Sequence, residues 1–172
     1  SNMAMTNIPS MVYGTFLCMA IVSLMIGVGL KSWRLGTISF FVNSLPVAIA
    51  LGLWGFINGR IDIGVAAVGT LSFGIVVDDT IHFMTHYQKY KQQDGMTTVD
   101  AIREIFVSSG LAMITTTVAL ICGFGILAFS HYSANANMGF LTATCMFLAI
   151  IFDLCALPAW LVWRDQAEIK ND

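Results

Sequence analysis

The chain has 172 residues, of which 57% are hydrophobic and only 10% are charged, and its mean hydropathy is +0.79. A soluble domain of this size needs more polar residues than this to cover its surface. The composition therefore excludes a soluble domain and places the chain in a lipid bilayer. The net charge of -2 says little about partners, because the distribution of charge among loops matters more in a membrane protein. We expect no nucleic-acid partner.

Five apolar segments follow one another, each close to the about 20 residues that cross a hydrocarbon core of about 30 Å. These predicted transmembrane helices are residues 11–30, 37–56, 63–85, 109–129 and 138–163. We therefore predict an all-α fold, a polytopic membrane helix bundle with five transmembrane helices in one domain over residues 11–163. Residues 1–10 are expected to be a tag remnant and external tail without a signal peptide, and residues 164–172 a cytoplasmic tail.

Basic residues are unevenly distributed among the connections between these spans. Seven of the eight fall on one side of the predicted topology, namely Lys31, Arg34, Lys89, Lys91, Arg103, Arg164 and Lys170, and only Arg60 falls on the other. By the positive-inside rule the carboxyl end is cytoplasmic, whereas the amino end and the loops at 58–60 and 133–137 face outward. The expected location is the bacterial inner (plasma) membrane.

Residues 86–107 interrupt the hydrophobic pattern between the third and fourth spans. Thr97 or Thr98 is a candidate N-cap for a helix over about residues 97–107. An apolar stripe on this helix predicts a short interfacial helix on the cytoplasmic face of the membrane, and a solvated helical connector is the alternative. The stripe consists of Ala101, Ile102, Ile105 and Phe106.

Two adjacent carboxylates, Asp78 and Asp79, interrupt the third span. A bare charge inside a membrane helix costs at least about 2.5 kcal/mol, so such residues are usually functional. Neighbouring aspartates that cannot both ionise cheaply have coupled proton affinities, which is the chemistry of an intramembrane proton carrier. A structural hydrogen-bonded pair without turnover is the alternative.

Other polar residues lie at the same predicted depth, given a rise of about 1.5 Å per residue. Because they come from several helices, we expect one buried site or water-lined path, slightly cytoplasmic of the midplane. Thr116 and Asp153 are candidates for a proton relay, although threonines often bond their own helix and neighbouring polar groups could satisfy Asp153. The full set is Asn43, Ser44, Thr115, Thr116, Thr117 and Asp153.

His82 follows Asp78 by four residues and Asp79 by three, so it shares a helix face with both. It could extend a proton path toward the cytoplasm. The alternative is that His82 reaches the membrane interface beside His86 and Tyr87.

Cysteine and glycine spacing excludes several kinds of site. The widely spaced Cys18, Cys122, Cys145 and Cys155 each lie in an apolar span, so they are predicted to be small buried residues rather than metal or disulfide partners. We expect no metal and no cofactor. Glycines at 64, 69, 74, 123 and 125 predict close helix crossings or hinges, and no nucleotide-binding loop accompanies them.

The aspartates also raise the possibility that the protein is an enzyme. Asp79 and Asp153 at one depth could formally make an intramembrane aspartic protease. The chain has no Gly-x-Gly-Asp arrangement, and the second carboxylate, Asp78, lies beside the first. We therefore predict that the protein is not an enzyme.

A series of short motifs occurs in a recognisable order: residues 31–36, 43–47, 62–64, 74–83, 115–116, 123–124, 153–154 and 157–158. The most specific combination is Val-Asp-Asp-Thr-Ile-His-Phe at 77–83 with Ser-Trp-Arg-Leu-Gly at 32–36. In these motifs the chain resembles the carboxyl-terminal membrane half of a resistance-nodulation-division (RND) superfamily exporter over residues 11–163. The closer likeness is to its hydrophobe and lipid exporters (MMPL), whose five-helix unit is similar to the sterol-sensing domain.

The resemblance implies a monomeric or trimeric proton-driven exporter of hydrophobic or lipid-like substrates, in which these spans are the eighth to twelfth helices. The expected relay comprises Asp78, Asp79, His82, Thr116 and Asp153, without the membrane-embedded lysine of the multidrug pumps. Expected partners are the lipid bilayer, the substrate, and an amino-terminal transmembrane half with external domains. The alternative function is a sterol-sensing-like regulatory module that binds a lipid between its helices.

Overall fold

The computed structural model describes residues 33–58, 63–92 and 94–169, with scattered positions between residues 13 and 28. Every regular element in this part of the chain is a helix, which confirms the predicted all-α class. Several predictions lie wholly or largely outside the described residues. They concern the tail at 1–10, the first span at 11–30 with Cys18, the loop around residue 60 and the end of the chain at 170–172.

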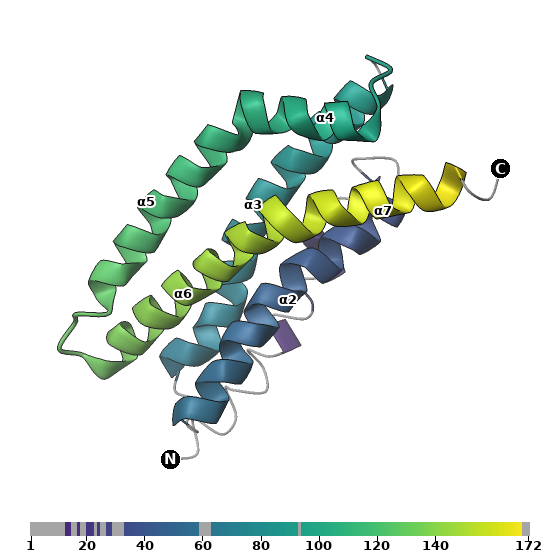
Figure 1. The fold of residues 1–172 in the computed structure, drawn as a ribbon. Helices are drawn as coiled ribbons and strands as arrows, with labels where there is room; N and C mark the ends of the chain where they lie inside the picture. Colours follow the sequence, from purple (N-terminus) through teal and green to yellow (C-terminus); the bar gives the residue numbers. More distant parts are fainter. Residues whose placement is uncertain are drawn as a thin grey trace.

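The helices form two single elements and two long interrupted ones. The single helices are α2 (Trp33–Asn58) and α3 (Ile63–Gln92). Figure 1 shows α4 (Thr98–Ile105) bending into α5 (Leu111–Leu127) and α6 (Ser133–Ile151) running on into α7 (Leu157–Ile169). Each of these junctions is a single π-helical turn, η1 (Phe106–Gly110) and η2 (Phe152–Ala156).

Three of the described helices are long and apolar enough to cross a membrane: Gly36–Ile57, Thr98–Leu127 and Ser133–Ala167. They contain the second and fifth predicted spans and all but the last two residues of the fourth. The third predicted span forms most of α3, a continuous helix of 30 residues. The number of five spans stays a prediction.

Helix boundaries differ from the predicted ones. α3 continues through the polar segment after His86, and α7 continues to Ile169 in the predicted tail. The predicted outer loop at 133–137 forms the first turns of α6, and the reversal lies at 128–132. Hydropathy marks only the apolar part of a helix, whereas backbone hydrogen bonds continue as long as side chains find water or a partner.

α4 begins where its N-cap predicted. The side chain of Thr97 accepts a hydrogen bond from the backbone N–H of Asp100 at 3.2 Å, after a turn in which Gly95 has a φ of 63°. The apolar stripe packs against α3 and α7, except for Phe106, which is exposed, and the interfacial position of the helix stays a prediction. The buried residues of α4 are Thr98, Ala101, Ile102 and Ile105.

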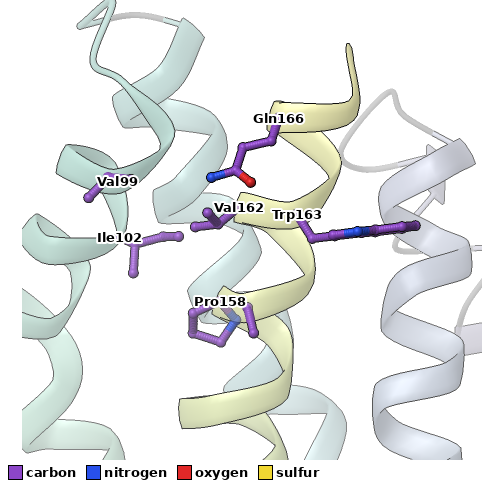
Figure 2. Close-up of a pocket in the computed structure, with 7 residues that line it drawn as sticks. Val99, Ile102, Pro158, Val162, Trp163 and Gln166 are labelled. Atoms are coloured by element: carbon purple, nitrogen blue, oxygen red, sulfur yellow. The ribbon is translucent and has the colours of Figure 1, made fainter. Parts of the chain in front are cut away.

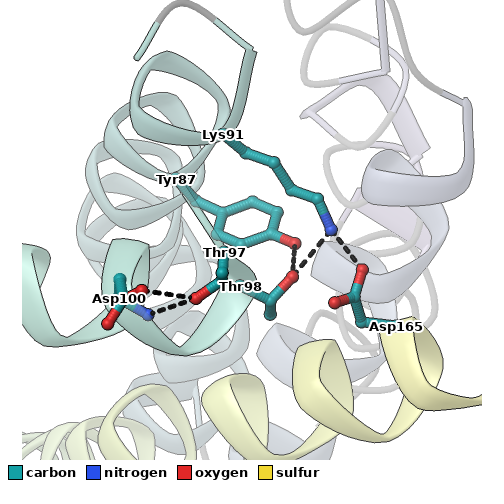
Figure 3. A network of polar contacts seen from close by, with 6 residues as sticks. All are labelled: Tyr87, Lys91, Thr97, Thr98, Asp100 and Asp165. Atoms are coloured by element: carbon teal, nitrogen blue, oxygen red, sulfur yellow. Dashed lines mark hydrogen bonds and ion pairs between the residues drawn. The ribbon is translucent and has the colours of Figure 1, made fainter. Parts of the chain in front are cut away.

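A polar cluster explains why α3 continues beyond its apolar part (Figure 3). Lys91 forms an ion pair with Asp165 of α7 and donates a hydrogen bond to the Thr98 hydroxyl at 2.7 Å, and the Tyr87 hydroxyl lies 3.3 Å from the same oxygen. Burial works to lower the pKa of Lys91, but the hydrogen bond to Asp165 and the interactions with Tyr87 and the Asp165 charge together outweigh it and raise this pKa above its usual value. The cluster therefore fastens the end of α3 to α4 and α7.

α6 is the central helix of the described bundle, because it packs against α2, α3 and α5 (Figure 1). It approaches α5 closely at Gly139, where a Cβ atom would lie 2.6 Å from the Leu127 Cβ and 2.6 Å from the Phe124 carbonyl oxygen. The predicted close crossings at glycines 74, 123 and 125 were wrong, because a Cβ at each of these would have open space.

Replacing Gly139 by alanine should therefore destabilise the bundle, because the backbones of α5 and α6 must separate to admit the methyl group. Overpacking of this kind costs about 1–3 kcal/mol. Gly125→Ala is the matched control, since it adds the same methyl group to open space and alanine favours a helix. Unfolding in mixed micelles measures both variants, and equal stability of the two would contradict the close approach.

Candidate functional site

Three buried polar side chains meet where α2, α3 and η2 pack together. The Thr80 hydroxyl oxygen lies 2.7 Å from Asn43 Oδ1 and 2.8 Å from Asp153 Oδ1. Each of these residues is at most 1% exposed. Asn43 continues the chain of contacts, because its Nδ2 donates to the carbonyl and hydroxyl oxygens of Ser39 at 2.8 and 3.0 Å. Buried polar groups need such partners, so the cluster fixes the relative position of three helices.

The backbone around Asp153 is unusual because this residue lies in the π-helical turn η2. Pro158 follows the turn and has no N–H group, so the Leu154 carbonyl loses the partner that it would have in a regular α-helix. A wide turn at this place accommodates that loss. π-Helical turns inside α-helices are frequent at functional sites, where they redirect a side chain.

A second polar contact joins α3 to α5. The Thr117 hydroxyl lies 3.0 Å from Asp79 Oδ2 and 2.8 Å from the Met113 carbonyl oxygen. Thr117 is buried, whereas Asp79 is half-buried. Asp79 also interacts electrostatically with Asp78, His82 and Asp153, so it lies between the buried cluster and the outer face of α3.

The structure brings Asp79 and Asp153 into the site and places the other predicted relay residues at its edge. Asp78 and His82 are exposed on α3, and the His82 ring lies 4.6 Å from the ring of His86, centroid to centroid. Thr116 is exposed as well and bonds the carbonyl oxygens of its own helix. The contact expected of Thr116 is made by Thr117 instead.

Thr80 and Thr117 were not predicted as individual site residues. Residues 115–117 are three consecutive threonines whose side chains point about 100° apart, so only one can face α3, and the sequence does not say which. The signal in the sequence that could have identified Thr80 as a site residue is its position directly after Asp78 and Asp79. Its two partners are 37 and 73 residues away in the chain, which no local pattern reveals.

The cysteines do not contribute to the site. Cys145 is buried as predicted, but Cys122 and Cys155 are exposed on the bundle, so their predicted burial was wrong. Among the described residues, no group of three or more His, Cys, Asp or Glu side chains lies close enough to hold a metal ion.

The apolar helices and the polar cluster between them define a multi-pass membrane protein. No family model matches the chain. The chain is 30% identical over 133 residues to a protein of Methanocaldococcus jannaschii that is named as a membrane protein. The match covers 75% of this chain and 34% of that protein, so the chain spans about a third of the relative's length.

Removing the Thr117 hydroxyl should destabilise the packing of α5 against α3. Thr117→Val keeps the shape of the side chain but leaves the half-buried Asp79 carboxyl without this donor, at a cost of about 1–3 kcal/mol. Thr116→Val is the matched control, since it removes an exposed hydroxyl that bonds only its own helix. Unfolding in mixed micelles compares them, and a larger loss in Thr116→Val would refute the assignment of this contact.

Proposed function

We propose that this chain is the transmembrane part of a proton-motive-force-driven exporter of hydrophobic or lipid-like substrates, with an intramembrane aspartate proton relay. The observation that carries the proposal is the Asp79 carboxyl, half-buried on α3 and hydrogen-bonded to Thr117 of α5. Carboxyl groups inside membrane helices are costly and mark ion or proton pathways. The resemblance of residues 11–163 to RND exporters supports the same function.

The contact between Asp79 and Thr117 offers a way for a proton to change helix packing. The Met113 carbonyl oxygen already accepts the backbone N–H of Thr117 within α5, so the single hydrogen of the Thr117 hydroxyl is free to turn to an ionised Asp79. An ionised carboxylate accepts a stronger hydrogen bond than a neutral acid does, so proton binding to Asp79 weakens its hold on Thr117. α5 packs against α6, and the contact between Thr117 and Asp79 is its polar link to α3. Proton binding therefore biases the position of α5, and through it the parts of the exporter that move the substrate.

In this proposal, the relay comprises Asp78, Asp79, His82 and Asp153, and Thr117 takes the place of Thr116. We propose that His82, which interacts electrostatically with Asp79 and lies beside His86, carries protons toward the Lys91 end of α3. By the positive-inside rule, this end and the carboxyl end are proposed to face the cytoplasm, and the membrane is proposed to be the inner membrane of a bacterium. The protein is proposed to act without a cofactor and not as an enzyme, together with an amino-terminal transmembrane half and external domains.

A groove favours a second function, that of a sterol-sensing-like regulatory module that binds lipid. It lies between α4 and α7 and has a volume of about 420 Å³. Figure 2 shows Val162 and Gln166 of α7 on the side of α4, while Trp163 extends away from Val99 and Ile102. The lining is apolar except for Gln166, which suits a lipid tail near its polar end. It consists of Val99, Ile102, Pro158, Ala159, Val162, Trp163 and Gln166.

Export by the complete protein under an imposed proton gradient separates the two functions. Asp78→Asn and Asp79→Asn keep shape and hydrogen bonding but cannot titrate, so each should slow export by roughly 100-fold or more if it carries protons. Asp153→Asn should cost less, and the exposed Cys122→Ala almost nothing. Wild-type export by the double variant Asp78→Asn/Asp79→Asn would refute the relay and favour the lipid-binding module.

Cysteine labelling tests the proposed orientation. In a variant without native cysteines, a cysteine at Asn135 in the first turn of α6 should react with an impermeant reagent added outside the cell. A cysteine at Gln92, at the end of α3, should react only after the membrane is opened. The reverse pattern would invert the topology, and with it the direction of the proposed proton path.

A further inference from the structure

In the hydrogen-bond cluster of Asn43, Thr80 and Asp153, the Thr80 hydroxyl contacts two oxygen atoms but has only one hydrogen to donate. Asn43 Nδ2 faces the Ser39 carbonyl oxygen at 2.8 Å, and a carbonyl oxygen can only accept. The amide orientation of Asn43 is therefore fixed, with Oδ1 toward Thr80. Oδ1 can also only accept, so the contact of 2.7 Å requires the single hydrogen of the Thr80 hydroxyl.

The contact between Thr80 and Asp153 then needs a second hydrogen. The two oxygens lie 2.8 Å apart, and the Thr80 hydrogen is already directed to Asn43. The hydrogen between Thr80 and Asp153 must come from the carboxyl group. We infer that Asp153 is a second proton-binding site, which carries a proton and donates it in a hydrogen bond to Thr80, with Thr80 and Asn43 as its positioning residues.

The surroundings of Asp153 agree with a neutral acid. Its Oδ2 atom is buried and has no hydrogen-bond partner among the described residues. α2 contributes no ionisable residue between Gly36 and Ile57, and the charged side chain of α3 that acts on Asp153 is Asp79, which has the same sign. An ionised carboxylate here would be buried beside a like charge and would be short of donors.

The direction of the hydrogen bonds depends on this proton. If Asp153 ionises, the Thr80 hydrogen turns to the carboxylate, and the buried Asn43 Oδ1 loses its donor. The link between α2 and α3 is thereby broken while that between α3 and η2 is strengthened. Within the proposed function, on which this step rests, Asp153 holds the three helices in register while it carries its proton, and release of that proton to the relay breaks the polar link between α2 and α3.

Infrared spectroscopy of the complete protein in lipid vesicles at neutral pH tests the inference. The difference between wild type and Asp153→Asn should contain the carbonyl stretch of a protonated carboxylic acid, and this band should persist in Asp79→Asn. Thr80→Val should shift the band to higher frequency because the acid loses its acceptor, whereas Thr80→Ser keeps the hydroxyl and should leave the band in place.

Carboxylate bands alone in that difference spectrum would overturn the inference, as would a band that Thr80→Val leaves unmoved or that Asp79→Asn removes. The comparison of Thr80→Val with Thr80→Ser decides the question even where Asp153→Asn fails to fold. Export by Asp79→Asn tests the proposed function separately, because the state of Asp153 is read from its own absorption whether or not the protein transports anything.

Discussion

The bundle depends on one constraint: polar side chains placed among apolar helices must satisfy each other. Asp153, Thr80 and Asn43 do so across η2, α3 and α2. Dispersion and hydrophobic contacts hold helices together but tolerate sliding, since one apolar side chain replaces another at small cost. A buried hydrogen bond tolerates it poorly, because a shift of a few ångströms leaves donors and acceptors unpaired. The cluster therefore sets the register of the helices that pack around α6.

α5 is held differently from the other helices. It lies against α6, with a close approach at Gly139, and reaches α3 through the bond between Thr117 and Asp79. A helix fixed by packing on one side and by a single charged contact on the other can respond to a change at that contact without disturbing the rest. In the proposed function, α5 is therefore the element of the described bundle whose position responds most directly to a proton at Asp79.

Two polar clusters at different places in the bundle differ in their chemistry. Near the end of α3, Lys91 and Asp165 are both partly exposed. Water screens their ion pair, so the pair by itself contributes little to the stability of the fold. Around Asp153 the side chains are buried, so charge is expensive and a neutral donor is favoured. The first cluster fastens α4 and α7 to α3 in a wet region. The second is buried, and this burial is the reason for which we infer that Asp153 carries a proton there.

Much of the fold followed from the sequence alone. Hydropathy placed the second, third and fifth predicted spans, and nearly all of the fourth, in helical segments, and the N-cap at Thr97 marked the start of α4. The depth of polar residues correctly grouped Asn43, Asp79 and Asp153 at one level, because a helix has a fixed rise per residue. The motif that includes Asp78 and Asp79 identified the region of the candidate site.

Only the tertiary structure decided which side chains meet. Depth along a helix follows from residue number, but rotation about its axis depends on how neighbouring helices pack, and this rotation directs Thr117 rather than Thr116 to Asp79. For the same reason Gly139, and not Gly125, is the close crossing. The sequence by itself determined that the chain is a membrane helix bundle with carboxyl groups inside it. The structure decided that Asp153 has Thr80 and Asn43 as partners, because residues far apart in the chain become neighbours only when the helices pack.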